Sequence, residues 1–316
     1  MGLSASTWHY RRHPRAGVTA PVPQSQRAYP SRLSPAEQDQ ILAKLRKGFA
    51  AGDSVYQSWY DALDAGDPIA SQASWYRLAR TIEPERPYRP RRHRRSAAMP
   101  QFDATAPNQV WCWDITKLPG LYRGQWWSMY SIIDVFSRFL VGWRIEEAED
   151  DDMAQDMFER AIADQGGHRP QIVHSDRGSS MTSNVMVDFY RDMGIIQSKN
   201  RPRVSNDNPY KESWYRTLKH KPGTPTLFRD LDQARAWATQ RVEAYNTGHH
   251  HTSLEGHTPH AVHYNTWQAT HHARQATLDQ LAATHPERYH DQPRLKTPMA
   301  NVRLNMKTPT QRLQPA

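Results

Sequence analysis

The chain has 316 residues, a length that allows about two domains with tails. Its 41 Lys and Arg residues exceed its 32 Asp and Glu residues, and the pI near 9.6 favours a polyanionic partner, of which nucleic acid is the first expectation. A single cysteine, Cys112, excludes a disulfide framework and a cysteine-based zinc site, and the lack of any long apolar run or signal segment predicts a cytoplasmic protein with no membrane partner.

The excess positive charge is concentrated in the N-terminal third, since residues 1–106 carry a net +7 and residues 107–316 a net +2. Residues 1–33 end in a stretch rich in Pro, Ser and Arg, and we interpret them as an arm and linker. Ser34, Pro35 and Glu37 form a capping box that predicts a helix over residues 35–49.

Two further short helical patterns follow, over residues 54–63 and after Ser71. Three short helices with a tight turn before the third indicate a helix-turn-helix domain over residues 34–83. The third helix would present Arg77 and Arg80 to DNA. A generic three-helix bundle whose arginines are only solvated remains an equal alternative.

Residues 84–106 form a basic linker with six Arg and two Pro between positions 86 and 95. Because proline prevents a helix and like charges repel, we expect an extended segment that follows DNA phosphates. A solubilising hinge is the alternative. The expected phosphate contacts are Arg91, Arg92, Arg94 and Arg95.

From residue 107 the pattern changes to aromatic and β-branched runs separated by turns, which predict a three-strand antiparallel meander. Helical and strand patterns then alternate, and two helices end the series. The order predicts an α/β domain with a mixed sheet over residues 107–265. The strands are expected over residues 109–118, 126–136, 139–145, 170–176 and 195–199, and the helices over 146–165, 182–194, 210–219 and 230–246.

Three acidic residues stand out by their positions in these elements. Asp114 lies inside the apolar first strand, Asp176 ends the fourth, and Glu212 lies in the helix after a loop, with 35 residues between the last two. Carboxylates brought together repel, and hard divalent cations such as Mg²⁺ or Mn²⁺ relieve that repulsion. Two such ions support in-line phosphoryl transfer. Chance spacing is the alternative, because about one residue in ten is acidic.

The chain resembles the integrase-core transposases of bacterial insertion sequences, the D,D-35-E type that is encoded by a second reading frame and related to retroviral integrases. The resemblance is carried by VWCWDITKL, IIDVFSR, VHSDRGSS, SNDNPYKESWYRTLK and YNTGHHHTSLEGHTPHAVHY. It implies an RNase H-like mixed five-stranded sheet with flanking helices, preceded by the small all-α helix-turn-helix domain. It also implies that Asp114, Asp176 and Glu212 are catalytic and bind two Mg²⁺ or Mn²⁺ ions.

The same resemblance implies a transposase that binds double-stranded DNA at the element ends. It would hydrolyse a phosphodiester with metal-activated water and direct the exposed 3′-hydroxyl at target DNA. We expect a homo-multimer on DNA in the bacterial cytoplasm, associated with the nucleoid. Residues 2–12 resemble the end of another helix-turn-helix, which implies an upstream helix-turn-helix partner protein. Two rivals are a DNA-binding regulator with an inert core and an RNase H-like nuclease without strand transfer.

Basic residues near the acidic triad are expected to hold DNA phosphates. Arg216 and Lys219 share a helix face with Glu212, although a Glu212–Arg216 ion pair is the alternative for Arg216. Lys199, Arg201 and Arg203 belong to the preceding strand and loop, whose alternative is an ordinary solvated loop.

Other notable residues have structural interpretations. Asp134 with Ser137 is expected to brace a hairpin, His174 to pack in its strand, and Trp214 to lie in the core. The chain departs from the family before Glu212, where residues 208–211 are bulkier than usual, and at residues 249–251, where histidines replace frequent arginines. The histidines generate the hypothesis of pH-sensitive DNA contacts. Residues 266–316 are a C-terminal tail with one helical pattern over 273–281 and no assigned role.

Overall fold

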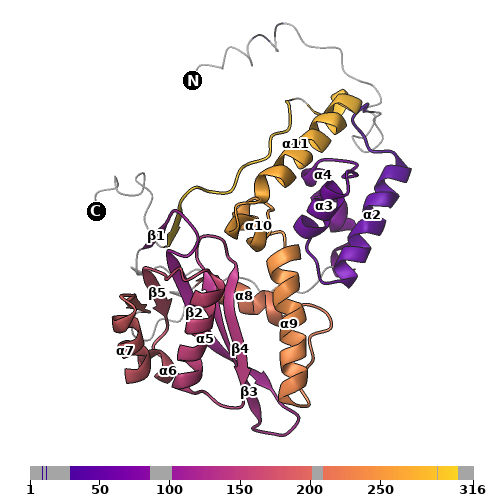
Figure 1. The fold of residues 1–316 in the computed structure, drawn as a ribbon. Helices are drawn as coiled ribbons and strands as arrows, with labels where there is room; N and C mark the ends of the chain where they lie inside the picture. Colours follow the sequence, from indigo (N-terminus) through magenta and orange to yellow (C-terminus); the bar gives the residue numbers. More distant parts are fainter. Residues whose placement is uncertain are drawn as a thin grey trace.

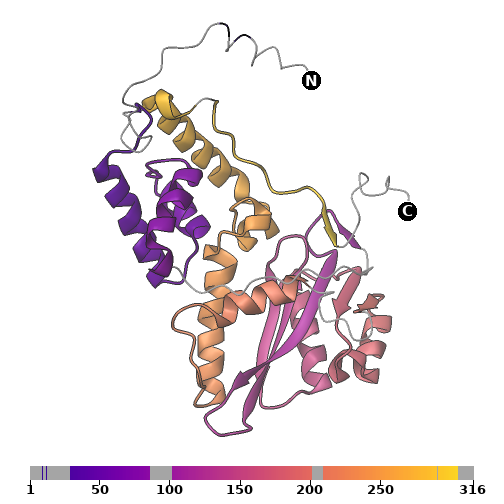
Figure 2. The same cartoon turned by 180° about the vertical axis from the view of Figure 1, so that it is seen from behind.

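The computed structural model describes residues 29–85, 102–200, 209–289 and 291–304, together with positions 9 and 12. A helical unit and an α/β unit lie one above the other, joined by the C-terminal third of the chain (Figures 1 and 2). Six of the basic residues predicted to contact DNA lie outside the described residues: Arg91, Arg92, Arg94, Arg95, Arg201 and Arg203.

The helical unit begins with the three helices that the sequence predicts: α2 (Pro35–Ala50), α3 (Val55–Asp64) and α4 (Gln72–Ala79), followed by the 3₁₀ segment η2 (Arg80–Glu85). The capping box before α2 is confirmed, because the Ser34 side chain accepts from the Glu37 N–H and the Glu37 carboxylate accepts from the Ser34 N–H. Ser71 is the N-cap residue of α4, but its side chain makes no capping hydrogen bond.

The α/β unit contains the mixed five-stranded sheet, as predicted. Its strands are β2 (Val110–Pro119), β3 (Trp126–Asp134), β4 (Leu140–Glu146), β5 (Ile172–Ser175) and β6 (Ile196–Lys199), in the spatial order β4-β3-β2-β5-β6. The first three form the antiparallel meander, and β5 and β6 continue it in parallel with β2. This order, with these directions, is the RNase H-like arrangement.

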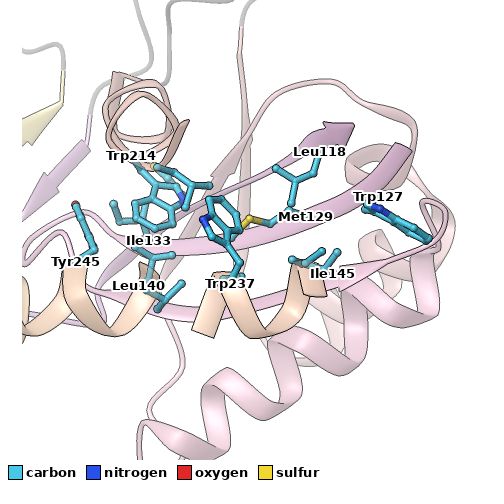
Figure 3. Packing of buried hydrophobic residues seen from close by; sticks show 14 of the residues in the cluster. Leu118, Trp127, Met129, Ile133, Leu140, Ile145, Trp214, Trp237 and Tyr245 are labelled. Atoms are coloured by element: carbon cyan, nitrogen blue, oxygen red, sulfur yellow. The ribbon is translucent and has the colours of Figure 1, made fainter. Parts of the chain in front are cut away.

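Helices cover both faces of the sheet. On one face lie α5 (Asp151–Asp164), α6 (Ser179–Thr182) and α7 (Asn184–Asp192), and on the other α8 (Pro209–Lys219) and α9 (Leu231–Gly248) (Figures 1 and 2). Buried apolar side chains fill both interfaces, and Figure 3 shows the one beneath α8 and α9.

Strand β2 lies in the middle of the sheet and supplies side chains to both faces alternately. Trp111 and Trp113 belong to the core under α5 and α7, whereas Val110 and Cys112 belong to the core under α8 and α9. Because successive side chains of a strand alternate between faces, Asp114 shares the α8 face with Cys112. The alternation of side chains along β2 therefore places Asp114 on the face of the sheet that α8 covers.

The C-terminal third returns to the helical unit and then to the α/β unit. After η4 (Thr252–Leu254) and α10 (Pro259–His263), the long α11 (Trp267–Thr284) packs beside α3, where Leu278 joins the core of the helical unit. Past η5 (Pro286–Arg288), strand β7 (Val302–Leu304) pairs with β1 (Phe102–Ala104) (Figure 1). Residues 266–304 thus include elements that connect the two units.

An ion pair joins α11 to α3 at the junction of the two units. Arg274 is 3% exposed, donates through Nε and Nη2 to the Asp64 carboxylate, and through Nη1 to the Gly256 carbonyl at 2.9 Å. Its guanidinium lies over the Tyr60 ring, 4.7 Å from the centroid. Gly256 has φ +80°, and a Cβ there would lie 2.1 Å from the Tyr60 ring, so only glycine allows this approach.

A second ion pair fastens the segment after α11. Arg288 donates to both carboxylate oxygens of Glu37, at 2.9 and 3.0 Å. The hydrogen bond from Arg288, together with those from Ser34, outweighs burial and lowers the pKa of Glu37 to about 2. The residue that caps α2 thereby also holds the chain on its way to β7.

No helix within the described ranges is both long enough and apolar enough to span a membrane.

The junction ion pair predicts a stability effect. Replacing Arg274 with Met leaves the Asp64 carboxylate without its buried partner, so we expect a loss of about 2–3 kcal/mol in the free energy of unfolding. Urea denaturation followed by circular dichroism measures it. The matched control is Lys44→Met, because Lys44 pairs with Asp67 at the surface and should contribute less than about 1 kcal/mol. Equal losses in the two variants would contradict this interpretation.

The same junction predicts a dependence of stability on pH. Burial, reinforced by Arg274 and His271, lowers the pKa of His257 to about 3, although Asp64 opposes the shift. Burial lowers the pKa of His271 as well. Because unfolded histidine titrates near pH 6.5, the unfolded chain binds protons first, and stability present above pH 6.5 is lost as the pH falls toward 3.

At pH 5, the contribution of His257 amounts to a loss of about 2 kcal/mol relative to pH 7.5. We expect His257→Gln to remove this part of the pH dependence, as measured by urea denaturation at both pH values. A variant that loses as much stability between pH 7.5 and pH 5 as the parent protein would show that His257 is not the group responsible.

Candidate active site

The register of the sheet brings two of the predicted acidic residues side by side. In the parallel pair of β2 and β5, Cys112 lies opposite His174. Two residues after Cys112, on the same face of the sheet, is Asp114. Two residues after His174 is Asp176, which directly follows the end of β5. Neighbouring strands lie about 4.8 Å apart, so the two carboxylates face α8 next to each other.

A single ammonium group joins the two carboxylates. Lys211, in the first turn of α8, places its Nζ 3.1 Å from Asp114 Oδ1 and 3.2 Å from Asp176 Oδ2. The side chains of Lys211 and Asp114 are 12% and 11% exposed, and that of Asp176 is 37% exposed. The sequence comparison with the family marks Lys211 only by its bulk. Its role beside the carboxylates could have been predicted from its place directly before Glu212, in a helix expected next to Asp114 and Asp176.

The environment shifts the pKa values of the two carboxyl groups in opposite directions. Burial raises the pKa of Asp114 to about 7, and the nearby Asp176 adds to the shift while Lys211 opposes it. Burial alone would raise the pKa of Asp176 too, but the Gly178 N–H, which donates to Oδ1 at 2.9 Å, and the Lys211 ammonium together lower it. The buried negative charge at this position needs a cation in contact with it.

The donor set suits a hard divalent cation. Carboxylate oxygens are the ligands that Mg²⁺ and Mn²⁺ prefer, and two of them already share one positive group here. Glu212 follows Lys211 in α8, but its side chain is outside what the structure describes. Among the side chains that are described, no three His, Cys, Asp or Glu residues form a metal-binding group. The structure therefore brings Asp114 and Asp176 together and leaves the role of Glu212 a prediction.

Helix α8 is fixed on the strand that carries Asp114. The Tyr215 hydroxyl donates to the backbone carbonyl of Asp114 and exchanges a hydrogen bond with Ser131 Oγ, both at 2.9 Å. One turn later, Lys219 Nζ donates to Thr116 Oγ1 at 2.6 Å. Residues 211, 215 and 219 are spaced four apart, so one stripe of the helix contacts β2.

The other basic residues predicted to bind DNA lie in two places. In the α/β unit, Arg216 is partly exposed on α8, and Lys199 at the end of β6 is in register with Ser175, which precedes Asp176. In the helical unit, Arg77 and Arg80 lie on the exposed side of α4 and at its C-cap.

Asp134 braces the hairpin between β3 and β4, as predicted. Its Oδ1 accepts from the Ser137 N–H at 2.7 Å and from Ser137 Oγ at 2.6 Å, and its Oδ2 accepts from the Asn108 N–H at 2.8 Å. Burial nevertheless raises its pKa to about 6. This carboxylate already has its donors within the protein and is distinct from the acidic pair.

Two other structural interpretations are confirmed. His174 is fully buried in β5 between Ser198 Oγ and Asn200 Oδ1, at 3.1 and 2.8 Å. Trp214 is 2% exposed, and its ring lies against Tyr245 in the core under α9 (Figure 3).

The consecutive histidines make contacts within the protein. His249 stacks on Tyr245. His250 is buried at the junction of the two units, with Nε2 3.0 Å from Asp61 Oδ1. His251 Nδ1 accepts from the Ser253 N–H and so caps η4. These contacts assign the three rings to packing, and the hypothesis of pH-sensitive DNA contacts gains no support from them.

A groove of about 710 Å³ lies elsewhere, between the β4 edge and helices α5 and α9. Its lining includes neither Asp114, Asp176 nor Lys211. The acidic pair therefore lies outside this groove.

Comparison with known families assigns this part of the chain. Two models of the integrase core domain match it, one over residues 104–205 and the other over residues 193–259. Relatives include the transposase for insertion sequence element IS904 of Lactococcus lactis, 35% identical over 50% of this chain and 62% of that protein. A putative transposase for IS150 of Escherichia coli is 26% identical, over 50% of this chain and 55% of that protein.

Residues 104–259 are therefore similar to integrase core domains, and this part of the chain is similar to the transposases of bacterial insertion sequences. The match spans a little over half the length of these curated relatives.

Two solved viral structures are also similar. The HTLV-2 integrase catalytic core domain in complex with magnesium is 17% identical, with a TM-score of 0.38 over 50% of this chain and 97% of that one. The simian T-cell lymphotropic virus intasome is 17% identical, with a TM-score of 0.42 over 62% of this chain and 67% of that one.

The contrast between the carboxylates predicts different responses to the same isosteric change. Asp134→Asn replaces one acceptor oxygen by a donor facing buried N–H or O–H groups, so we expect a loss of about 2–3 kcal/mol in the free energy of unfolding. Asp114→Asn removes a carboxylate that burial disfavours and leaves the Lys211 ammonium paired with Asp176, so we expect a change within about 1 kcal/mol at pH 7. Urea denaturation without metal compares them, and the reverse ranking would contradict the division into structural and functional groups.

Proposed function

We propose that this chain is the catalytic polypeptide of an insertion-sequence transposase, a DDE-type polynucleotidyl transferase that acts on DNA in the bacterial cytoplasm. The observation that carries the proposal is the pair formed by Asp114 and Asp176. It lies at adjacent positions on one face of an integrase core domain, with a single cationic group against both carboxylates.

In this proposal Asp114, Asp176 and Glu212 hold Mg²⁺ or Mn²⁺, two ions in each active site. The ions would supply an activated water or 3′-hydroxyl and would stabilise the leaving oxygen of the phosphodiester. The protein itself orients the oxygen ligands, because Gly178 fixes the Asp176 carboxylate and Tyr215 fixes α8 on the Asp114 strand. No covalent link between protein and DNA is required for either step.

Basic side chains around the acidic residues would hold the phosphates of a DNA end. Lys219 and Arg216 lie on α8, where Lys219 contacts Thr116 of β2, and Lys199 ends β6, the strand beside β5. Arg201 and Arg203 of the following segment would add to them. Each phosphate contact releases counterions, so binding should weaken steeply with salt.

The helical unit would bind the terminal repeats through α4, with Arg77 and Arg80 directed at DNA and the basic residues 91, 92, 94 and 95 following the phosphates. Because transposition joins two ends, the working form would be a homo-multimer on DNA. An upstream helix-turn-helix protein is a further proposed partner.

Replacing Asp176 tests the proposal most simply. We expect Asp176→Ala to lower both end cleavage and strand transfer by at least about a thousandfold, while binding of end DNA stays within about twofold. Gel assays with Mg²⁺ on labelled end duplexes measure cleavage, precut ends measure strand transfer, and a mobility shift measures binding.

A reciprocal variant, Arg77→Ala/Arg80→Ala, should weaken end binding and reduce its salt dependence, yet leave cleavage of bound DNA nearly unchanged. Full activity of Asp176→Ala would show that the core is inert and favour a DNA-binding regulator. Cleavage by the parent protein without any joining of precut ends would favour a nuclease of the same fold.

A further inference from the structure

The Lys211 ammonium lies between Asp114 and Asp176, where a metal ion shared by the two carboxylates would have to bind. Its Nζ is the group in contact with both Asp114 Oδ1 and Asp176 Oδ2, at 3.1 and 3.2 Å. The ammonium is largely buried, with 12% of the side chain exposed. Two carboxylates at adjacent strand positions would otherwise repel each other in a medium of low dielectric constant.

The position of Lys211 is set by the way α8 docks and not only by its own ion pairs. Lys211 is one turn before Tyr215, which is bonded to the Asp114 carbonyl, and two turns before Lys219, which is bonded to Thr116. All three contacts lie along the same stretch of β2. The first turn of the helix is therefore held over the carboxylates, and the side chain at position 211 meets them.

The ammonium and a divalent cation would compete for the same two carboxylates. Mg²⁺ binds carboxylate oxygens at about 2.0–2.1 Å, so an ion shared by Asp114 and Asp176 would lie close to an ammonium that contacts both of them. Two positive groups in contact would also repel strongly in a largely buried place.

We propose that Lys211 is a built-in counter-ion that holds Asp114 and Asp176 together in the metal-free protein and must be displaced before a divalent cation binds. The inference rests on the proposed function, since it concerns the same site. Lys211 acts here as a positioning residue. It keeps the two oxygen ligands preassembled, and it lowers the affinity of the metal-free protein for divalent cations.

Metal binding and thermal stability of the full chain test this role without measuring DNA cleavage. The probe is Mn²⁺ alone, its free fraction followed by electron paramagnetic resonance, and melting is compared in EDTA and in Mn²⁺. We expect Lys211→Met to bind Mn²⁺ about tenfold more tightly than the parent protein, because the metal no longer competes with an ammonium. We also expect a lower melting temperature in EDTA and a larger rise on adding Mn²⁺.

Two controls separate charge from packing. Lys211→Arg keeps a cation at this position and should retain the parent response. Lys117→Met removes an ammonium from the same strand as Asp114, but Lys117 pairs with Glu149, so its Mn²⁺ affinity should equal that of the parent. Lys211→Gln, a second neutral variant, should bind Mn²⁺ as Lys211→Met does and serves if the methionine variant does not fold.

The outcomes distinguish this inference from the proposed function. If the neutral variants bind Mn²⁺ no more tightly than the parent protein, or melt lower by the same amount with and without Mn²⁺, Lys211 is merely structural and the inference is overturned. Binding that Asp176→Ala does not weaken would overturn the proposed metal site itself, whatever the Lys211 variants show.

Discussion

Two carboxylates that lie side by side, one of them buried, require a positive charge in contact with them, and the α/β unit is organised around that requirement. The parallel register of β2 and β5 puts Asp114 level with Asp176, and the pleat directs Asp114 toward α8. Helix α8 is fixed there by Tyr215 and supplies the ammonium of Lys211. The sheet and α8 together define the site, because neither positions all of these groups alone.

The helical unit depends on parts of the chain that lie far apart in sequence. Its core is closed by Leu278 of α11, its edge by the pair of Arg274 and Asp64, and its first helix by the pair of Arg288 and Glu37. The chain then returns to the α/β unit, where β7 pairs with β1. The helical unit is accordingly linked to the α/β unit at several points along the chain.

Features set by local sequence could be predicted, whereas features set by distant contacts could not. The capping box at Ser34 and the aromatic and β-branched run of β2 specify their elements within a few residues. The side-by-side placement of Asp114 and Asp176 was suggested by their positions in the predicted strands and implied by the family resemblance, but the register between β2 and β5 cannot be read from either strand alone. The position of Lys211 depends on that register and on the docking of α8, and the packing of α11 on α3 depends on a fold already formed.

A crystal structure of the full chain with Mn²⁺, with anomalous scattering recorded, is the most direct measurement of the acidic site. We predict an anomalous peak about 2.1 Å from carboxylate oxygens of both Asp114 and Asp176, with Glu212 as a further ligand and the Lys211 ammonium moved away from the pair. A structure at saturating Mn²⁺ that shows no peak between these residues, or that turns Glu212 to another face of the domain, would contradict the account.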